Sequence, residues 1–258
     1  GGEMVLNARV EELVVTDNRV SQVRLADGRT FDADAVASNA DVVNTYKKLL
    51  GHHPVGQKRA AALERKSMSN SLFVLYFGLN QPHPQLAHHT ICFGPRYREL
   101  IDDIFTGSAL ADDFSLYLHS PCVTDPSLAP PGCASFYVLA PVPHLGNAPL
   151  DWAQEGPKLR DRIFDYLEER YMPGLRSQLV TQRIFTPADF HDTLDAHLGS
   201  AFSIEPLLTQ SAWFRPHNRD SDIANLYLVG AGTHPGAGIP GVVASAKATA
   251  SLMIEDLQ

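Results

Sequence analysis

The sequence has little of several features that define common protein classes. Only three cysteines occur among its 258 residues, no CxxC pair is present, and no stretch of 18 apolar residues appears. These absences argue against a disulfide framework, a zinc knuckle and a helix that spans a bilayer. Charged residues make up only 19% of the chain, the net charge is −8, and the sequence contains no run of lysine and arginine. We therefore predict no nucleic-acid binding, and the cysteine usage favours a reducing, cytoplasmic setting.

Histidine is frequent, but its spacing follows no metal-binding motif. The eleven histidines are scattered or doubled, as at His52-His53 and His88-His89, and neither HExxH nor HxH occurs. Motifs of that kind place two imidazoles on one face of a helix or strand. The sequence therefore predicts no metal site.

Local patterns predict both strands and helices. Residues 4–37 alternate between apolar and polar types, with turn signals at 16–18 and at Asp27-Gly28, which predicts an antiparallel meander. Helical spacing appears at 42–50, after possible capping residues at 38–41, and again at 58–66 and 159–171. Residues 186–189 form a helix start, and residues 210–222 predict a loop.

Two long segments, residues 67–95 and 126–150, contain no charged residue. Their centres, 72–77 and 135–139, are short runs of aromatic and branched side chains, which are typical of strands covered on both faces. Two interpretations stay open. The runs form a central sheet in the core, or one face of them lines an apolar ligand tunnel.

The last 34 residues are the most informative part. A short apolar strand at 225–229 leads into a glycine-rich stretch, 230–241, and then into a helix from about 240 to 256. The motif Gly236-x-Gly238-x-x-Gly241 lies too far from the strand, with no second strand after the helix, to be a dinucleotide fingerprint. The helix start suits a partly anionic group, such as a reduced flavin ring or a phosphate. A glycine-rich connection without a ligand is the alternative.

The closing segment resembles that of bacterial-type phytoene desaturases, which are FAD-dependent carotenoid desaturases. Residues 225–239 read Asn-x-Tyr-Leu-x-Gly-Ala-Gly-Thr-His-Pro-Gly-Ala-Gly-Ile, and Ser245 follows six residues later. Further stretches similar to the family lie at 37–41, 68–73, 86–89 and 213–218. The resemblance extends over the whole chain.

The resemblance implies an α/β fold of mixed α+β character. A partial FAD-binding domain, made of the meander and the C-terminal strand, loop and helix, would comprise residues 1–44 and 220–258. An inserted substrate domain, residues 45–219, would be built on a mostly antiparallel sheet and helices. Family members begin with a strand, a GxGxxG turn and a helix that grip the ADP half of FAD, which this chain lacks. We therefore expect a C-terminal fragment whose partner is the missing N-terminal half of the same polypeptide.

The resemblance also implies site residues. The cofactor-binding set is Gly232, Thr233 and His234 near the flavin ring, Pro240, Gly241 and Val242 at the helix start facing its pyrimidine end, Val10 beside the adenine, and Asn39 close to the cofactor. The predicted lining of the substrate tunnel is Phe73, Tyr76, Phe77 and Trp213. No catalytic acid or base is predicted. His234 is a candidate, with local packing as the alternative.

The implied activity is desaturation of phytoene to a conjugated carotenoid such as lycopene, by hydride transfer from allylic carbons to the flavin. The substrate is a long apolar polyene, so its binding must come from buried apolar area, at roughly 25 cal/mol per Å². Because such a substrate dissolves in the bilayer, we expect peripheral association with the cytoplasmic face of the cell membrane. Residues 126–150 could contact lipid or belong to the core.

Two other functions stay open. One keeps the flavin and changes the substrate, as in a polyene isomerase, a saturase or an amine-oxidase relative. An amine substrate would call for an aromatic cage and a lysine near the flavin, and the sequence places neither. The other is an inactive fragment or an interaction module.

Overall fold

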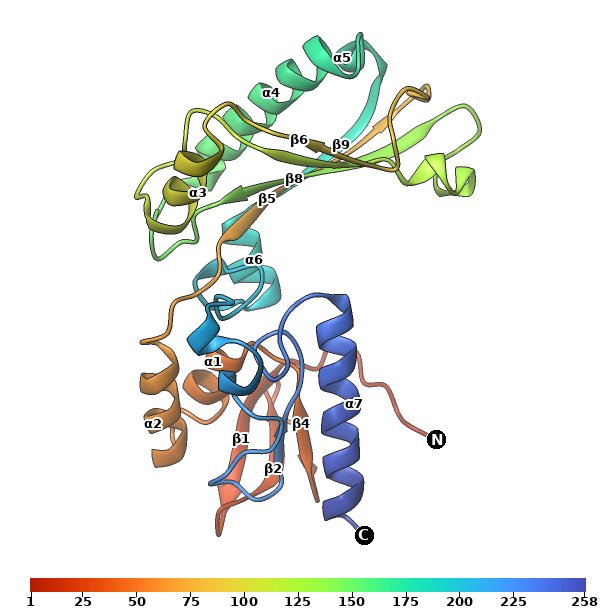
Figure 1. Cartoon of the computed structure of the whole chain (residues 1–258). Coiled ribbons are helices and arrows are strands. Elements are labelled where there is room, and N and C mark those ends of the chain that lie inside the picture. Colours follow the sequence, from red (N-terminus) through yellow and green to blue (C-terminus); the bar gives the residue numbers. More distant parts are fainter. The chain divides into compact units, whose positions relative to one another are not determined.

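The computed structural model describes all residues from 1 to 258, which form two compact units. The first unit comprises residues 1–69, 195–197 and 202–258, and the second comprises residues 70–194 and 198–201 (Figure 1). The second unit is shorter than the predicted substrate domain, 45–219. Residues 45–69, 195–197 and 202–219 belong to the first unit, where the turn that follows residue 44 packs on the meander.

The first unit begins with the predicted meander. Strands β1 (Val10–Thr16), β2 (Arg19–Leu25) and β3 (Thr30–Asp32) pair antiparallel in that order. Asp17 and Asn18, between β1 and β2, have φ near +50° and +57°, a conformation that these residue types tolerate. Gly28 turns the chain after β2 with φ +89°. The prediction of a meander with these two turns is confirmed.

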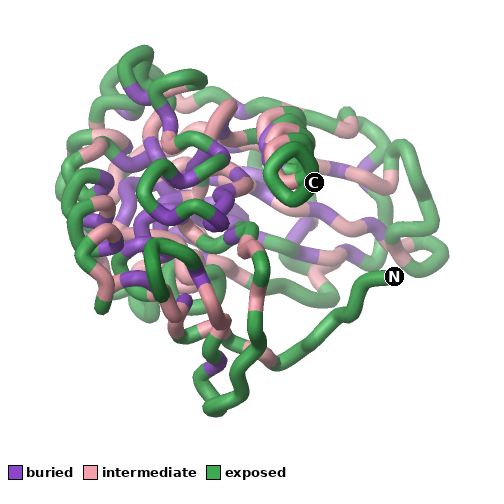
Figure 2. Tube along the Cα trace, turned by 90° about the horizontal axis from the view of Figure 1, so that it is seen from below, coloured by how far each residue is buried: buried purple, intermediate pink, exposed green.

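A second, parallel pair joins distant parts of the same unit. Strand β4 (Val36–Ser38) pairs with β10 (Leu226–Leu228), and helix α7 (Ile239–Asp256) packs against β10. Helix α7 ends at the C mark in Figure 2 and is exposed along its outer side. Asn225 fixes this junction through its amide group, which bonds to the backbone of Val20 and of Asp34 at 2.7–2.8 Å. The predicted strand, glycine-rich stretch and helix at the end of the chain are confirmed.

Side chains cap the first two helices of this unit. Asp41 accepts the N–H groups of Val43 and Asn44 at 2.9 and 3.1 Å, so α1 (Val42–Asn44) begins there and continues as the π-helical turn η1 (Thr45–Leu49). Helix α2 (Pro54–Leu63) begins four residues before the predicted start at 58. His53 caps it, and proline at the first position favours helix initiation.

The second unit is built on a five-stranded sheet in which every neighbouring pair is antiparallel. The strand order is β6-β7-β8-β5-β9. The strand bounds are Ser71–Leu79 for β5, His89–Cys92 for β6, Leu116–His119 for β7, Ala134–Val142 for β8 and Leu179–Phe185 for β9. The two charge-free segments supply β5 and β8, which pair along their full length at the centre. The prediction of a central sheet from these segments is confirmed, but the expected coverage of both faces is wrong for β8, whose side chains alternate between buried and half-buried.

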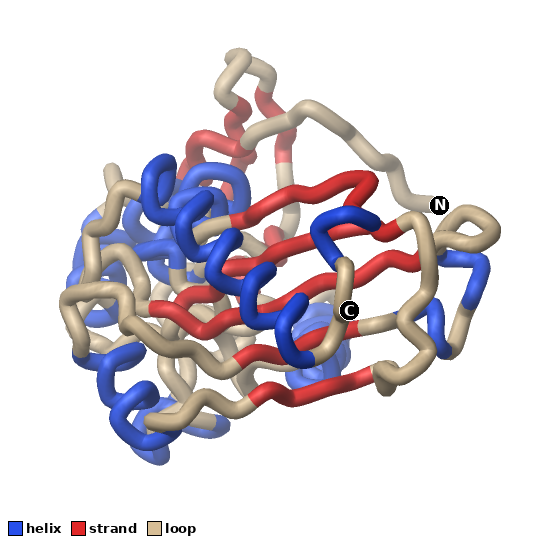
Figure 3. Tube along the Cα trace, turned by 90° about the horizontal axis from the view of Figure 1, so that it is seen from above, coloured by secondary structure: helices blue, strands red, loops and turns tan.

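Helix α4 (Trp152–Arg170) covers one face of this sheet (Figure 3). Leu159, Ile163, Phe164 and Leu167 of α4 pack on the inward side chains of β5, β7 and β8 and form the main core. The helix starts before Gly156-Pro157, not after it as the proline signal suggests, because Asp151 accepts the N–H of Ala153 and caps the helix earlier.

The remaining helices of the second unit are short. They are α3 (Tyr97–Thr106), α5 (Leu175–Gln178) and α6 (Pro187–Leu194), with 3₁₀ turns at Pro121–Val123 and Pro126–Leu128. Thr186 and Asp189 exchange hydrogen bonds at the start of α6, which confirms the predicted capping residues. None of the helices in the structure is both long and apolar enough to cross a membrane.

The opposite face of the sheet, here named the open face, carries aromatic and histidine side chains. Strand alternation and the pairing register place on it, among others, Tyr76, His89, Tyr117, His119, Tyr137 and Leu139, with Arg183 of β9 opposite Tyr76. Tyr76 is 45% exposed, whereas its neighbour Phe77 on the covered face is 3% exposed. The sheet therefore has one dry face and one accessible aromatic face.

Substitution of neighbours on β5 tests this two-faced arrangement. Phe77 stacks on Phe136 and meets Phe164 edge-on, at centroid distances of 5.2 and 5.5 Å. We expect Phe77→Ala to lower the free energy of unfolding by about 3–5 kcal/mol. The matched variant Tyr76→Ala should cost less than about 1 kcal/mol, because this side chain is exposed. Urea unfolding followed by circular dichroism measures both, and equal losses would contradict the assignment of faces.

Candidate functional site

The segment between β10 and α7, residues 229–238, is here named the glycine loop. A buried polar cluster holds it against the helix. Ser245 Oγ accepts the Gly230 N–H at 3.1 Å and lies 3.0 Å from Thr233 Oγ1. The Asn218 amide nitrogen lies 3.0 Å from Ser245 Oγ and 3.1 Å from Thr249 Oγ1. The hydroxyl of Thr233, a predicted cofactor residue, therefore points into this cluster.

Two glycines of the loop have no room for a side chain. Gly230 has φ +113°, and a Cβ atom there would lie 2.5 Å from Asn39 Oδ1. A Cβ on Gly232 would lie 2.7 Å from Val42 Cγ1. The structure thus brings the predicted residue Asn39, which is exposed, directly beside the glycine loop.

The start of α7 lies at the surface without a side-chain cap. Gly238 is the N-cap residue, Ile239 is 80% exposed, and Pro240 is exposed as well. The N–H of Val242 already bonds to the Gly238 carbonyl at 2.9 Å. The unpaired N–H groups before it carry the partial positive charge of the helix end. This part of the predicted set, Pro240, Gly241 and Val242, therefore fits a partly anionic group.

Two buried polar atoms beside the loop have no partner in the structure. His234 donates its backbone N–H to the Pro216 carbonyl at 2.9 Å, but its ring Nδ1 is buried and unpaired. Arg215 is 3% exposed, its Nη2 bonds to the Ile204 carbonyl, and its Nη1 is unpaired. Burial lowers the pKa of Arg215. A buried guanidinium with a free donor is costly unless an acceptor meets it, which again fits an anionic ligand.

Arg215 was not among the predicted site residues. It lies beside the loop because Gly236 has φ +142° and leaves room for it: a Cβ there would be 3.0 Å from Arg215 Nε. The aromatic and basic stretch 213–217 was the only signal in the sequence for this residue. It predicted a loop, but it did not predict that the Arg215 side chain lies beside the glycine loop.

Other titratable groups of the unit have structural partners. Burial is the main cause that raises the pKa of Asp41, opposed by the N–H groups it accepts at the start of α1. Burial, and after it Asp220, raises the pKa of Tyr46, whose hydroxyl donates to Asp220 at 2.5 Å. The Tyr46 phenol is therefore neutral and acts as a donor. Neither group is assigned as a catalytic base.

The remaining predicted residues belong to other elements. Val10 begins β1, where it pairs with Leu25 in the meander. Trp213 is 69% exposed and lies on a groove of about 490 Å³ between α2 and residues 213–221. Phe73 and Phe77 point into the core beneath α4, so packing accounts for both rings. Of the predicted tunnel residues in the second unit, only Tyr76 is on the open face.

Substitution at the polar cluster tests what holds the loop. Ser245→Ala removes the acceptor of the Gly230 N–H and leaves a buried donor unpaired, which should cost about 1–3 kcal/mol of unfolding free energy. Ser251→Ala, on the exposed side of the same helix, should change stability by less than about 0.5 kcal/mol. Thermal and urea unfolding compare the two. A neutral Ser245→Ala would mean that the cluster does not fix the loop.

Comparison with known proteins gives the chain clear relatives. The sequence matches the family described as flavin containing amine oxidoreductase over residues 1–254. It is 97% identical over 258 residues to the phytoene desaturase (lycopene-forming) of Pseudescherichia vulneris, and 72% identical over 257 residues to that of Pantoea ananas. Both alignments cover 100% of this chain and 52% of the relative. The chain therefore spans about half the length of the curated relatives it matches. The predicted resemblance is confirmed.

Solved structures share the fold at low sequence identity. An oxidoreductase from Methanosarcina mazei superposes with a TM-score of 0.55 at 16% identity, covering 95% of this chain and 48% of that one. Cyclohexylamine oxidase from Brevibacterium oxydans IH-35A gives 0.52 at 14% identity, over 92% and 47%. At such identities the likeness concerns the fold alone. The predicted mixed α/β architecture with antiparallel sheets is confirmed.

Proposed function

Because the chain belongs to the family of flavin-containing amine oxidoreductases, we propose that the protein containing it is an FAD-dependent desaturase that converts phytoene to lycopene. The observation that carries the proposal is the 97% identity, over all 258 residues, to a relative of that name. Residues 1–44 and 220–258 would contribute to the FAD-binding part, and the second unit would contribute to the substrate part.

The first unit supports the cofactor assignment through groups that suit an anionic ligand. The uncapped start of α7, Asn39 beside Gly230, and the unpaired donor of Arg215 would hold the flavin and orient it. When bound, the flavin supplies hydride acceptance from an allylic carbon. The helix end would stabilise negative charge on its ring. His234 Nδ1, buried and unpaired, is the ring nitrogen available to a ligand at this place.

The open face of the second unit supports the substrate assignment. A polyene offers no polar handle, so aromatic and aliphatic side chains must bind it by removing apolar surface from water. Tyr76, Tyr117 and Tyr137 lie side by side on the open face, with centroid distances of 5.9–6.0 Å between neighbours. This row would hold the chain of the substrate extended and exclude water from it.

Membrane association is the remaining part of the proposal. A hydrocarbon substrate reaches an enzyme from the bilayer, which favours a peripheral protein on the cytoplasmic face. The charge-free segment 126–150 gives limited support. Its centre is the core strand β8, and the exposed apolar side chain in it is Leu128 at its start.

The full-length protein that contains this chain should convert phytoene in lipid vesicles to lycopene when FAD is added, as followed by absorbance and product mass. Tyr76→Glu should raise the KM for phytoene about tenfold, because it places a charge on the open face. The control Val180→Glu, at an exposed position beside the irregular pairing at the start of β9, should leave KM unchanged. A product of unchanged mass would indicate an isomerase, one of higher mass a saturase, and no turnover would overturn the proposal.

Charge at the start of α7 tests the flavin assignment separately. Ile239→Glu puts a carboxylate at the helix end, where it would compete with the anionic part of the cofactor. We expect about a fivefold loss of FAD affinity in the full-length protein, from about 1 kcal/mol of helix-end interaction. Ile254→Glu, exposed in the last turn of the same helix, is the control and should bind as the parent does. Flavin fluorescence titration measures both. Equal affinities in the two variants would contradict the role of the helix start.

A further inference from the structure

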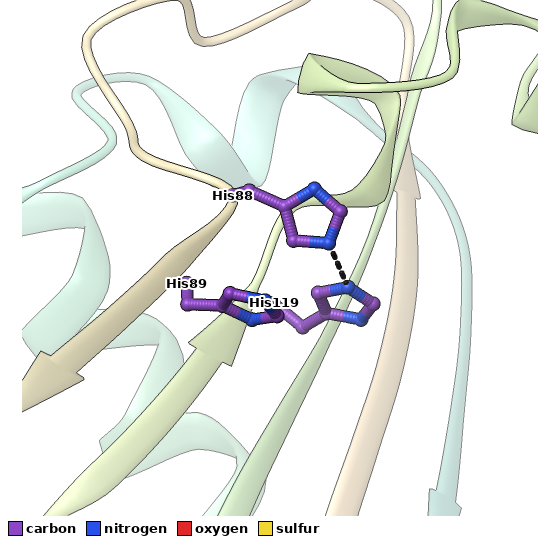
Figure 4. A group of neighbouring side chains, drawn as sticks. All are labelled: His88, His89 and His119. Carbon is purple, nitrogen blue, oxygen red and sulfur yellow. Dashed lines mark hydrogen bonds between the residues drawn. The ribbon is translucent and has the colours of Figure 1, made fainter.

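Three histidines come together at one end of the open face (Figure 4). His88 precedes β6, His89 is its first residue, and His119 is the last residue of β7, directly opposite His89 in the pairing register. One ring nitrogen of each lies within 4.8 Å of a ring nitrogen of the other two. Two neighbouring strands thus place three imidazoles around one point.

Hydrogen bonds orient these rings. His88 Nδ1 lies 2.5 Å from Thr124 Oγ1, and His89 Nδ1 lies 2.6 Å from Tyr117 Oη. Metal-ligating histidines commonly hold their outer ring nitrogen by such a partner, which fixes the ring and leaves the other nitrogen for the metal. In His88 and His89 the nitrogen that remains for this purpose is Nε2.

The third ring, His119, has one nitrogen bonded within the cluster and one that is unpaired. His119 Nε2 lies 2.8 Å from His88 Nε2, and His119 Nδ1 is buried without a partner. None of the three histidines forms an ion pair with a carboxylate. Burial first, and then the neighbouring charges of His88 and His89, lower the pKa of His119.

We propose that His88, His89 and His119 form a binding site for a divalent transition-metal ion, with zinc as the best-fitting case. Imidazole nitrogens suit zinc, copper and nickel. Three histidines with a fourth position open to water form a known type of zinc site, with Zn–N distances near ~2.0–2.1 Å. Tetrahedral ligands at that distance lie roughly 3.3 Å apart. The Nε2 atoms of His88 and His119 are 2.8 Å apart, so binding would require them to move apart by only about 0.5 Å.

The exposed side of His89 gives an ion a path from solvent. The site joins β7 to the edge strand β6 and, through Thr124, to the turn that follows β7. A bound ion would therefore stabilise this edge of the sheet as well as present a Lewis acid on the open face. The proposal concerns the second unit alone and does not depend on the flavin assignment.

Zinc binding to the full-length protein, first stripped with a chelator, tests the site. We expect His119→Ala and His89→Ala each to bind one zinc ion fewer per chain than the parent does. Tyr117→Phe should keep the site with about tenfold weaker affinity, because it removes an outer partner. His191→Ala, an exposed histidine of the same unit that pairs with Asp192, is the control and should bind as the parent does. Isothermal titration gives the stoichiometry and the affinity.

Two further readouts keep the outcome clear. Zinc should raise the melting temperature of the parent and of His191→Ala, and should not raise that of His89→Ala. Because His89 is exposed, its variant should fold even if His119→Ala does not, which circular dichroism checks. The proposal is overturned if the parent binds no zinc, or if His89→Ala binds it with the stoichiometry and affinity of the parent.

Discussion

The glycine loop depends on one buried polar cluster. A segment with so many glycines has a high conformational entropy in the unfolded chain and little side-chain surface to hold it in the folded one. Asn218, Thr233, Ser245 and Thr249 replace that surface with hydrogen bonds, all of them buried. These groups satisfy one another's hydrogen bonds. The side of the loop backbone and of the start of α7 that faces away from the cluster therefore stays available to a ligand. The proposed cofactor contacts are possible only with this arrangement.

The local patterns of the sequence were enough to predict most of the elements. Meander turns at Asp17, Asn18 and Gly28 and the cap at Asp41 depend on neighbouring residues, so local chemistry determined them. The early start of α4 was missed because the signal of Gly156-Pro157 competes with a cap at Asp151 that only the folded helix reveals. The charge-free runs predicted β5 and β8 but not which of their side chains would share the open face.

The candidate sites were harder to predict from the sequence than the helices and strands, because tertiary structure brings several of their residues together. The resemblance led to Asn39 and the start of α7, and the structure brings Asn39 beside Gly230. Arg215 reaches the loop only through tertiary packing, because the stretch 213–217 around it predicts a loop and not where its side chain points. His119 is 30 positions from His89, so no spacing motif could join them. Their meeting follows from the antiparallel register of β6 and β7, which is a property of the sheet.

The first unit is assembled from segments at both ends of the chain, and this has a consequence for its biosynthesis. Asn225 bonds to the carbonyl of Asp34, 191 positions earlier, and β4 finds its parallel partner only in β10. At roughly 5–20 residues per second, a ribosome needs about 10–40 s to make the intervening stretch. During that time β4 lacks the partner that β10 supplies, while the second unit, continuous but for four residues, is already complete enough to fold. The edge of β4 that β10 covers therefore stays open to other contacts until residues 226–228 have been made.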